Sequence, residues 1–239
     1  MNAAAQRGFS LVELSIVLVI IGALAGTAVI PLTTSIRQTH YKQTNRQLQS
    51  IREAMHGYLV SNGKLPCPVD ITSDNAAATD SSTPCILPAG GVPAAELGVM
   101  GQRSANGALL DRWGRPIQYA VSMTDNKELG TSGFPDWLSA GEPGTVGAEK
   151  LLADLQLCRK AVSSGCARKD LIADQIVWVI YSLGEGNDKN GIEAENQDED
   201  TVFAVSAYSI NVNQPFDDQV IWASRSELVY WLLRANWLP

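Results

Sequence analysis

The chain has 239 residues, of which 45% are hydrophobic and six are Trp, a composition typical of a globular protein long enough to bury its own core. Its net charge is −7, and no basic stripe with interleaved aromatic residues supports nucleic-acid binding through phosphates. Neither Gly-x-Ser-x-Gly nor His-Glu-x-x-His occurs, and the two His, His40 and His56, lie in one predicted helix. We therefore expect no enzymatic activity and no nucleic-acid partner.

Residues 11–30 form a long apolar stretch near the start of the chain. They contain one charge, Glu13, and a helix of that length, at about 1.5 Å per residue, spans a bilayer core of roughly 30 Å. The leader before it, residues 1–8, has one positive charge and no apolar core, whereas an ordinary secretory signal places its apolar region before the cleavage site. Cleavage between Gly8 and Phe9 would leave the hydrophobic helix in the mature protein.

The order of Gly8, Phe9 and Glu13 at the start of an unbroken apolar helix resembles the prepilin signature shared by type IV pilins and type II secretion pseudopilins. The resemblance covers residues 7–30. It implies that prepilin peptidase, a membrane-embedded aspartyl peptidase, cuts after Gly8 and methylates the new amino terminus at Phe9. It also implies assembly with other pilin or pseudopilin subunits on an inner-membrane platform.

Glu13 makes membrane insertion of this helix less favourable, since a carboxylate in an apolar membrane helix costs about 2.5 to 3.5 kcal/mol on insertion scales. In a filament of packed helices its partner would be the ammonium group of a neighbouring subunit's Phe9, an ion pair that also fixes axial register. The alternative is a tolerated polar residue near the cytoplasmic interface, since Glu13 lies about one helical turn from the new terminus. Because Gly8 and Phe9 precede it in the pattern of the prepilin signature, we expect Glu13 to have the assembly role.

Pro31 follows the apolar run and is expected to kink the helix or break it locally. Beyond it, apolar residues recur at helical spacing between basic residues, and Gly63 suits a C-terminal cap. The sequence therefore predicts four parts: a leader at 1–8, a transmembrane and filament-core helix at 9–31, an amphipathic helix half at 32–62, and a globular sheet domain with a C-terminal helix at 63–239.

Four cysteines, Cys67, Cys85, Cys158 and Cys166, lie outside the apolar stretch and allow three pairings. The local scheme, Cys67 with Cys85 and Cys158 with Cys166, closes short loops, and a loop of about 15 residues is worth roughly 3 kcal/mol in the chain-entropy model. We expect this scheme, which places the domain in an oxidising compartment. A metal site made by the cysteines is weaker, because no Cys-x-x-Cys occurs.

The basic residues near the apolar run give the opposite indication. Arg37, Lys42 and Arg46 follow the run while only Arg7 precedes it, so positive-inside counting would leave the domain in the cytoplasm. The cysteines and the prepilin resemblance outweigh this count. We expect a single-pass inner-membrane protein with its globular domain in the periplasm, which later enters a pilus or pseudopilus.

Turn residues and apolar periodicity outline the globular domain. Residues 64–110 are rich in Pro and poor in periodicity, which indicates a long connection stapled by a disulfide. Leu spacing predicts a helix at 146–158, and a capping box from Ser224 to Glu227 predicts a terminal helix. Strands are predicted at 116–123, 175–182, 201–208 and 220–223. The predicted fold class is α+β, with the long N-terminal helix packed on an antiparallel sheet, as the pilin resemblance also implies.

Two short segments resemble major pseudopilins more closely. Residues 111–119 contain Trp-Gly-x-Pro-x-x-Tyr, similar to the start of the first sheet strand in those proteins; a turn with a core Trp explains the same residues, and both can hold. Residues 181–184, Tyr-Ser-Leu-Gly, are similar to the segment that opens their calcium loop.

The segment from Glu185 to Asp200 holds seven acidic residues and one Lys. Ca²⁺ takes six to eight oxygen ligands, and the glycines here would let the backbone fold around it. The EF-hand spacing fails, and the pseudopilin pattern matches only in part, because Gly186 occupies its Asp position. The alternative is a solvated acidic loop, and no other cofactor is required. The candidate ligands are Leu183, Asp188, Glu193, Glu195, Asp198 and Asp200.

A second carboxylate pair, Asp217 and Asp218, is interpreted as a turn or strand start rather than as a site, because adjacent residues of a strand point to opposite faces. The resulting function prediction is a minor pilin of a type IV pilus, favoured by a length above that typical of major subunits. A type II secretion pseudopilin is the alternative within this class. An alternative of another class is a tip adhesin or DNA-binding module.

Overall fold

The computed structural model describes residues 10–72, 85, 87–122, 125–126, 131–132, 151–160, 166–186, 191–198, 200–211 and 214–238, without the side chains of 25–34, 125–126, 131–132, 210–211 and 214. The predicted site residues Gly8, Phe9 and Asp188 lie outside these ranges. The chain divides into two compact units, residues 1–42 and 43–239. Among the helical residues described, none form a segment with the length and apolarity needed to cross a membrane.

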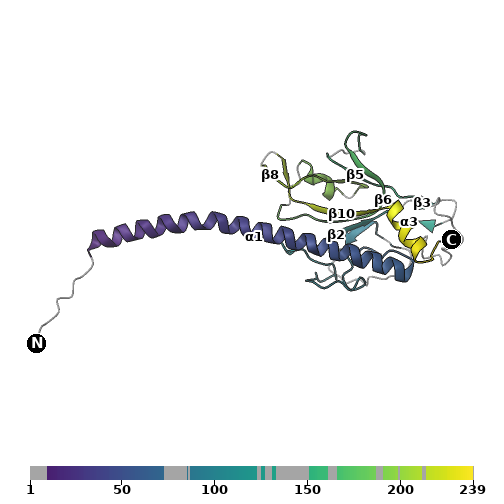
Figure 1. Ribbon diagram of the computed structural model, residues 1–239, viewed down its shortest axis with the longest axis horizontal. Coiled ribbons are helices and arrows are strands. Elements are labelled where there is room, and N and C mark those ends of the chain that lie inside the picture. Colours follow the sequence, from purple (N-terminus) through teal and green to yellow (C-terminus); the bar gives the residue numbers. More distant parts are fainter. Residues whose placement is uncertain are drawn as a thin grey trace, which may run out of the picture. The chain divides into compact units, whose positions relative to one another are not determined.

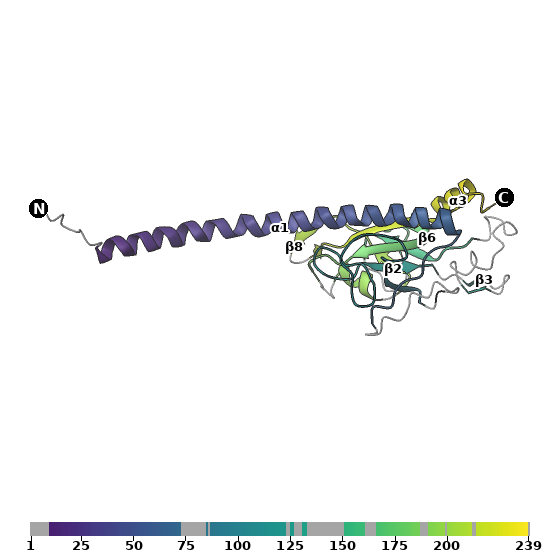
Figure 2. The ribbon, with the colours of Figure 1, turned by 90° about the horizontal axis from the view of Figure 1, so that it is seen from below.

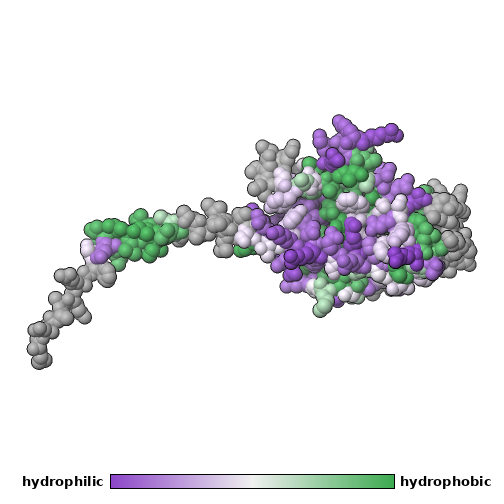
Figure 3. Space-filling view, viewed as in Figure 1, coloured by the Kyte–Doolittle hydropathy of each residue, from purple (hydrophilic) through white to green (hydrophobic). Residues whose placement is uncertain are grey.

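The first unit contains the N-terminal part of helix α1 (Leu11–Asn62). Of the two effects expected of Pro31, a kink or a break, the break does not occur, because α1 runs through this residue without interruption. Large apolar side chains from Leu11 to Leu24 are between 48% and 85% exposed, and they colour this part of the helix as hydrophobic in Figure 3. The apolar side chains of this part of α1 are therefore largely exposed.

The second unit begins with the remainder of α1, which buries one face. Leu48, Ile51, Met55 and Leu59 recur every three or four residues, so they share a face, and each is at most 1% exposed. The helix ends where the sequence predicts: Gly63 adopts φ +66°, and its N–H donates to the carbonyl of Leu59 at 2.8 Å.

A six-stranded sheet has the order β1, β2, β6, β5, β7, with β10 also pairing with β6. The pairs are antiparallel except β5 with β7, so the expected purely antiparallel sheet is corrected to a mixed one. Its strands are β1 (Ala89–Gly91), β2 (Gln118–Val121), β5 (Leu155–Cys158), β6 (Leu171–Ser182), β7 (Val202–Ala204) and β10 (Gln219–Ser224). Two small hairpins join β3 (Asp125–Asn126) to β4 (Thr131–Ser132) and β8 (Ser209–Asn211) to β9 (Gln214–Phe216).

Three predicted strands are found, as β2, β6 and β10, whereas the predicted strand at 201–208 shortens to β7. The predicted helix at 146–158 is wrong over its described part, because residues 155–158 form β5. Leu155 and Leu157 are buried on either side of the half-buried Gln156, which is a strand period that the spacing of the Leu residues obscured.

The second unit is two-layered around its sheet. One face of β2, β6 and β10 packs on the second part of α1 and on α3 (Arg225–Arg234), with Trp178 and Ile180 at the centre of this core. Figures 1 and 2 both show β6 and β2 beside this part of α1. The Ser224 side chain accepts from the N–H of Glu227 at 3.2 Å, which caps α3 as predicted. A second apolar cluster, including Leu157, Val179 and Phe203, covers the other face.

Two disulfides join Cys67 to Cys85 and Cys158 to Cys166, which is the local pairing expected from the sequence. The first bridge lies in the long connection between α1 and β2. Val69 exchanges backbone hydrogen bonds with Gly91 at 2.7 and 2.9 Å, so this connection is held against β1 by backbone pairing as well as by the disulfide.

The buried face of α1 generates the first prediction. Replacing Leu48 by Ala should lower the free energy of unfolding by roughly 2 to 5 kcal/mol, the usual cost of a cavity in a packed core. Urea unfolding of the full chain in detergent, followed by Trp fluorescence, measures the change. The matched control is Glu53→Ala at an exposed position of the same helix, expected within about 0.5 kcal/mol of wild type. Equal losses in the two variants would contradict this role.

Candidate functional site

Glu13 lies in the first turn of α1 and is exposed among apolar side chains that are exposed as well. A carboxylate at this end of a helix is favoured by the helix dipole, whose positive end is the amino terminus. The helix begins here with a bond from the Leu14 N–H to the Ser10 carbonyl at 3.1 Å. The described part of the segment therefore presents one carboxylate on an exposed apolar surface.

The two segments that resemble pseudopilins are joined through Asp111, which is 3% exposed. Its Oδ1 accepts from the N–H groups of Trp113 at 2.8 Å and Arg115 at 2.9 Å, which closes the turn before β2. Its Oδ2 accepts from the Ser182 hydroxyl at 2.7 Å, at the end of β6. A single buried carboxylate thus ties the Trp-Gly turn to the Ser-Leu-Gly segment.

The turn after β6 is held from two sides. The Arg115 guanidinium donates to the carbonyl of Gly186 and, at 2.9 Å, to that of Glu185. From the other side, Asp217 Oδ2 accepts from the N–H groups of Glu185 at 2.9 Å and Gly186 at 2.8 Å. Gly184 has φ +60°, and a Cβ there would lie 2.6 Å from the Asp217 carboxylate, so only glycine allows this approach.

Three carboxylates meet beside this turn. Glu193, Asp217 and Asp218 each offer an oxygen within 4.8 Å of the others, and Glu193 and Asp218 are 2% and 5% exposed. Glu193 belongs to the short helix η2 (Glu193–Gln197), and its Oε1 accepts from the Asp217 N–H at 2.8 Å. Asn196, also in η2, donates to Asp218 Oδ2 at 2.7 Å. We call these three residues the carboxylate cluster.

Burial raises the pKa of Asp218 to about 7. The hydrogen bond from Asn196 acts against this rise, the negative charges of Glu193 and Asp217 add to it, and the positive charge of Arg115 opposes it. The carboxylate cluster therefore disfavours a third negative charge at Asp218 near neutral pH.

The predicted calcium ligands separate into different places. Glu193 joins Asp217 and Asp218, whereas Glu195 lies with Asp198 and Asp200, a group whose two aspartates are exposed. Leu183 is half-buried and packs against the second apolar cluster, on the face of the sheet opposite α1. The structure thus brings together three of the six expected residues and adds a cluster that the sequence analysis missed.

The missed residues are Asp217 and Asp218. They lie between β9 and β10, so their interpretation as a turn before a strand agrees with the structure. That interpretation set them aside because adjacent strand residues point apart, a rule that does not apply to a turn. The adjacent pair of aspartates was the feature of the sequence from which this part of the cluster could have been predicted.

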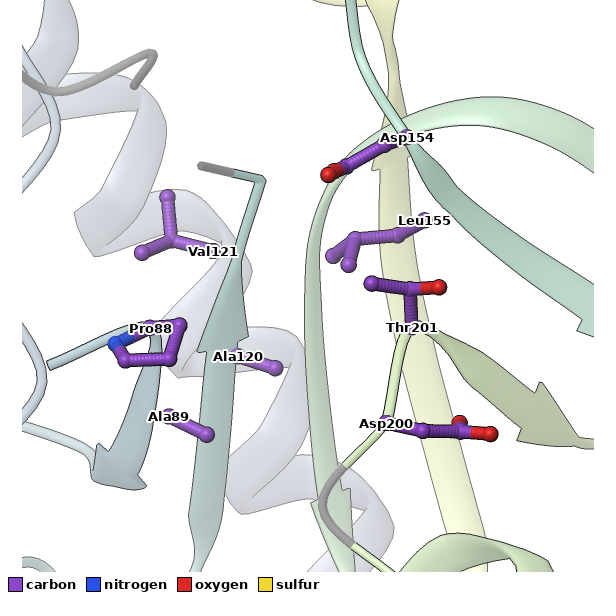
Figure 4. Close-up of a pocket in the computed structure, with 8 residues that line it drawn as sticks. All are labelled: Pro88, Ala89, Ala120, Val121, Asp154, Leu155, Asp200 and Thr201. Carbon is purple, nitrogen blue, oxygen red and sulfur yellow. The ribbon is translucent and has the colours of Figure 1, made fainter. Parts of the chain in front are cut away.

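A small pocket is lined by residues at β1 and β2 on one side and by residues at the starts of β5 and β7 on the other (Figure 4). Its volume is about 110 Å³, well below the roughly 300 to 1,000 Å³ of pockets for drug-sized ligands. Asp154 is already engaged, since its Oδ1 accepts from the Ser122 hydroxyl at 2.6 Å. The lining residues are Pro88, Ala89, Ala120, Val121, Asp154, Leu155, Asp200 and Thr201. The pocket does not carry a function by itself.

Comparison with known proteins adds one match. Residues 4–29 match the family described as the prokaryotic N-terminal methylation motif. Neither the curated proteins nor the solved structures gave a match. The chain therefore carries the type IV pilin and pseudopilin signature over its leader and the start of α1. The motif supports a pilin-like or pseudopilin role in general, with processing by prepilin peptidase and assembly with other pilin-type subunits as a structural subunit.

The raised pKa of Asp218 predicts how the free energy of unfolding depends on pH, for protein in a buffer that contains a chelator. Its folded pKa of about 7 exceeds its ordinary value of 3.8, so between these values the folded chain binds more protons than the unfolded chain. The free energy of unfolding of the wild type should therefore fall, relative to that of Asp218→Asn, as the pH rises through this window, and the difference should level off above it. Urea unfolding at a series of pH values measures both; parallel curves would contradict the prediction.

Proposed function

We propose that the chain is a minor subunit of a type IV pilus, anchored in the inner membrane by its N-terminal helix before assembly. The observation that carries the proposal is the methylation motif at residues 4–29. In this role, prepilin peptidase removes residues 1–8 and methylates Phe9. The mature subunit then begins with the ammonium group of Phe9, four residues before Glu13 in sequence.

The properties of α1 support this role. Its first part offers apolar side chains on all sides, as a helix needs when it is surrounded by lipid or by other helices. In an apolar environment, Glu13 requires a positive partner, and the amino terminus of a neighbouring subunit supplies one. The second part buries one face and has polar residues on the other, which suits a helix that holds a globular domain.

A low-copy role is favoured by the size of the second unit. It comprises residues 43–239 and includes a long connection before β2 that carries its own disulfide. Such additions suit a subunit that initiates assembly or decorates a fibre, in which tight repetition along the filament is not required.

A type II secretion pseudopilin is the second candidate, and one observation favours it. The two segments that resemble pseudopilins are bonded to each other through Asp111 and Ser182, so they form one local structure. Deletion of the gene in its native host separates the candidates: loss of surface pili supports the first, and loss of secreted hydrolases with intact pili supports the second. The adhesin or DNA-binding alternative has less support, because the chain is acidic, although Tyr230 and Leu233 of α3 are exposed.

The first prediction from this proposal concerns processing. Because Gly8 precedes a retained apolar helix, the mature protein in its native host should begin at Phe9 with a methylated amine. Mass spectrometry of the N-terminal peptide from membrane and sheared-filament fractions identifies the terminus. An intact leader in assembled material would overturn the prediction.

The second prediction concerns Glu13. Glu13→Ala should leave membrane insertion intact, because it removes an insertion cost of about 2.5 to 3.5 kcal/mol. Incorporation into sheared filaments should fall about tenfold or more, since a hydrogen-bonded charge is worth roughly 1.5 to 3 kcal/mol and 1.4 kcal/mol is a factor of ten. Quantitative immunoblotting measures both fractions. Glu53→Ala, which removes an exposed carboxylate farther along α1, is the control, and wild-type incorporation of Glu13→Ala would reject the assembly role.

A further inference from the structure

We propose that the basic hairpin between β5 and β6 docks at the small pocket of a second copy of this chain, whose own hairpin docks at the first copy in return. The pocket lies beside the starts of β5 and β7. Both features belong to the second unit, so this contact is separate from assembly through the N-terminal part of α1 and does not depend on it.

The first observation is a basic surface on an acidic protein. The net charge of the chain is −7, yet the residues between β5 and β6 include four basic side chains and one acidic residue, Asp170. All four basic side chains are exposed, and none forms an ion pair or a side-chain hydrogen bond with another described residue. We call these four residues the basic finger: Arg159, Lys160, Arg168 and Lys169.

The backbone on both sides of the finger is held in place. A disulfide joins Cys158 to Cys166 across the hairpin. The Arg159 N–H donates to the carbonyl of Asp170 at 2.8 Å, and the Asp170 N–H donates to that of Ala167 at 2.8 Å. A segment fixed before binding loses less conformational entropy on binding, so the finger suits docking better than a free chain segment does.

The second observation is a pocket that matches one basic side chain. Its volume of about 110 Å³ is small, and five of its eight lining residues are apolar, including Ala89 and Leu155. Lys and Arg bury their methylene stems against such surfaces while the charged group stays at the edge. In Figure 4 the Asp154 carboxylate points toward β2 across the gap. Its Oδ1 accepts from the Ser122 hydroxyl, and a carboxylate has further lone pairs for a second donor.

Exposed carboxylates surround this pocket. Gln156 pairs with Val202 in the parallel pair of β5 and β7, so the residues before the two strands lie at one edge of the sheet. Asp154 and Asp200 line the pocket, and a carboxylate oxygen of Asp198 lies within 4.8 Å of one of Asp200. Partial burial, and after it the charge of Asp200, raises the pKa of Asp198, so a cation beside them is favoured. We call Asp154, Asp198 and Asp200 the acidic rim.

The order of charges along β5 selects a second copy as the partner. Asp154 of the rim precedes the strand and Arg159 of the finger follows it, roughly 15 Å farther along at about 3.3 Å per residue. When two copies meet in opposite directions, each acidic rim faces a basic finger, and both contacts form together. Such an isologous contact is self-complementary and closes on itself. A partner of another sequence would need the same order of charges, whereas a second copy has it by identity.

The test uses the full chain in excess detergent, with separate batches labelled with a donor or an acceptor fluorophore at an added C-terminal tag. Energy transfer over a series of chain concentrations measures association. Wild type should associate, and a rise from about 0.1 M to about 1 M salt should weaken association roughly tenfold or more, because the Debye length falls from about 10 Å to about 3 Å. Association through the apolar part of α1 would not weaken in this way.

Two charge-reversal variants locate the contact. Arg168→Glu with Lys169→Glu reverses the tip of the finger, and Asp198→Lys with Asp200→Lys reverses the rim. Each double variant alone should associate roughly tenfold or more weakly than wild type, because like charges then face each other. An equimolar mixture of the two should associate again, since each finger then meets a rim of opposite charge.

Further variants separate the pocket from general charge. Ala89→Leu keeps every charge but fills the pocket, and Asp154→Asn keeps the shape but removes the carboxylate; each should weaken association. The control is Lys42→Glu with Arg46→Glu, which makes the same change in net charge at exposed positions of α1 and should associate as wild type does. Melting curves followed by Trp fluorescence show which variants fold, and Asp154→Asn decides if Ala89→Leu does not.

The proposal is overturned if wild type shows no salt-sensitive association, or if the mixture of the two charge-reversal variants stays apart. It is also overturned if the control variant loses as much association as they do, or if association survives both pocket variants. None of these results bears on leader cleavage or on the role of Glu13, so failure here is distinguishable from failure of the proposed function.

Discussion

The packing of one apolar stripe of α1 against the sheet is the contact on which the globular unit depends. Leu48, Ile51, Met55 and Leu59 enter the core that also contains Trp178 and Ile180 of β6. Burying such side chains contributes about 1.5 to 3 kcal/mol each. The stripe also fixes which face of the sheet is covered, so β2, β6 and β10 must present apolar residues there. From Leu11 to Leu24, by contrast, the large apolar side chains of α1 are exposed, and Glu13 is the one charged residue among them. One helix thus has a segment packed in the core of the second unit and a segment with exposed apolar side chains.

Elements with a strong local signal could be predicted from the sequence. The end of α1 at Gly63 and the cap of α3 at Ser224 each depend on one residue whose chemistry is specific. The buried part of β6 was predicted, at 175–182, from its continuous apolar run, although the strand itself begins earlier, at Leu171. In contrast, Leu155 and Leu157 fit a helix and a strand equally well, and the pairing of β5 with β6 and β7 decided between them. The alternation over these few residues is a strand period, but it is too short to decide by itself, and the pairing that decides is tertiary.

The candidate sites likewise divide into one with a local sequence signal and one that depends on tertiary contacts. Gly8, Phe9 and Glu13 lie within six residues of the sequence, and the match at residues 4–29 confirms the signature that contains them. The carboxylate cluster joins Glu193 in η2 to the adjacent pair Asp217 and Asp218 in the turn before β10, at least 24 residues later in sequence. Sequence analysis found the acidic segment because its charges are dense, but density alone favoured exposed residues such as Asp198. Burial, which the sequence does not show, distinguishes Asp218 from them.

The central claim is that the exposed apolar part of α1 is an assembly surface. The most direct test places a photo-reactive phenylalanine analogue at Leu18, which is 61% exposed, in the native host. After irradiation of cells with an intact assembly machinery, mass spectrometry identifies the adducts. The account predicts cross-links to the apolar N-terminal helices of other pilin-type subunits. Adducts with lipid alone, in cells that assemble filaments normally, would contradict it.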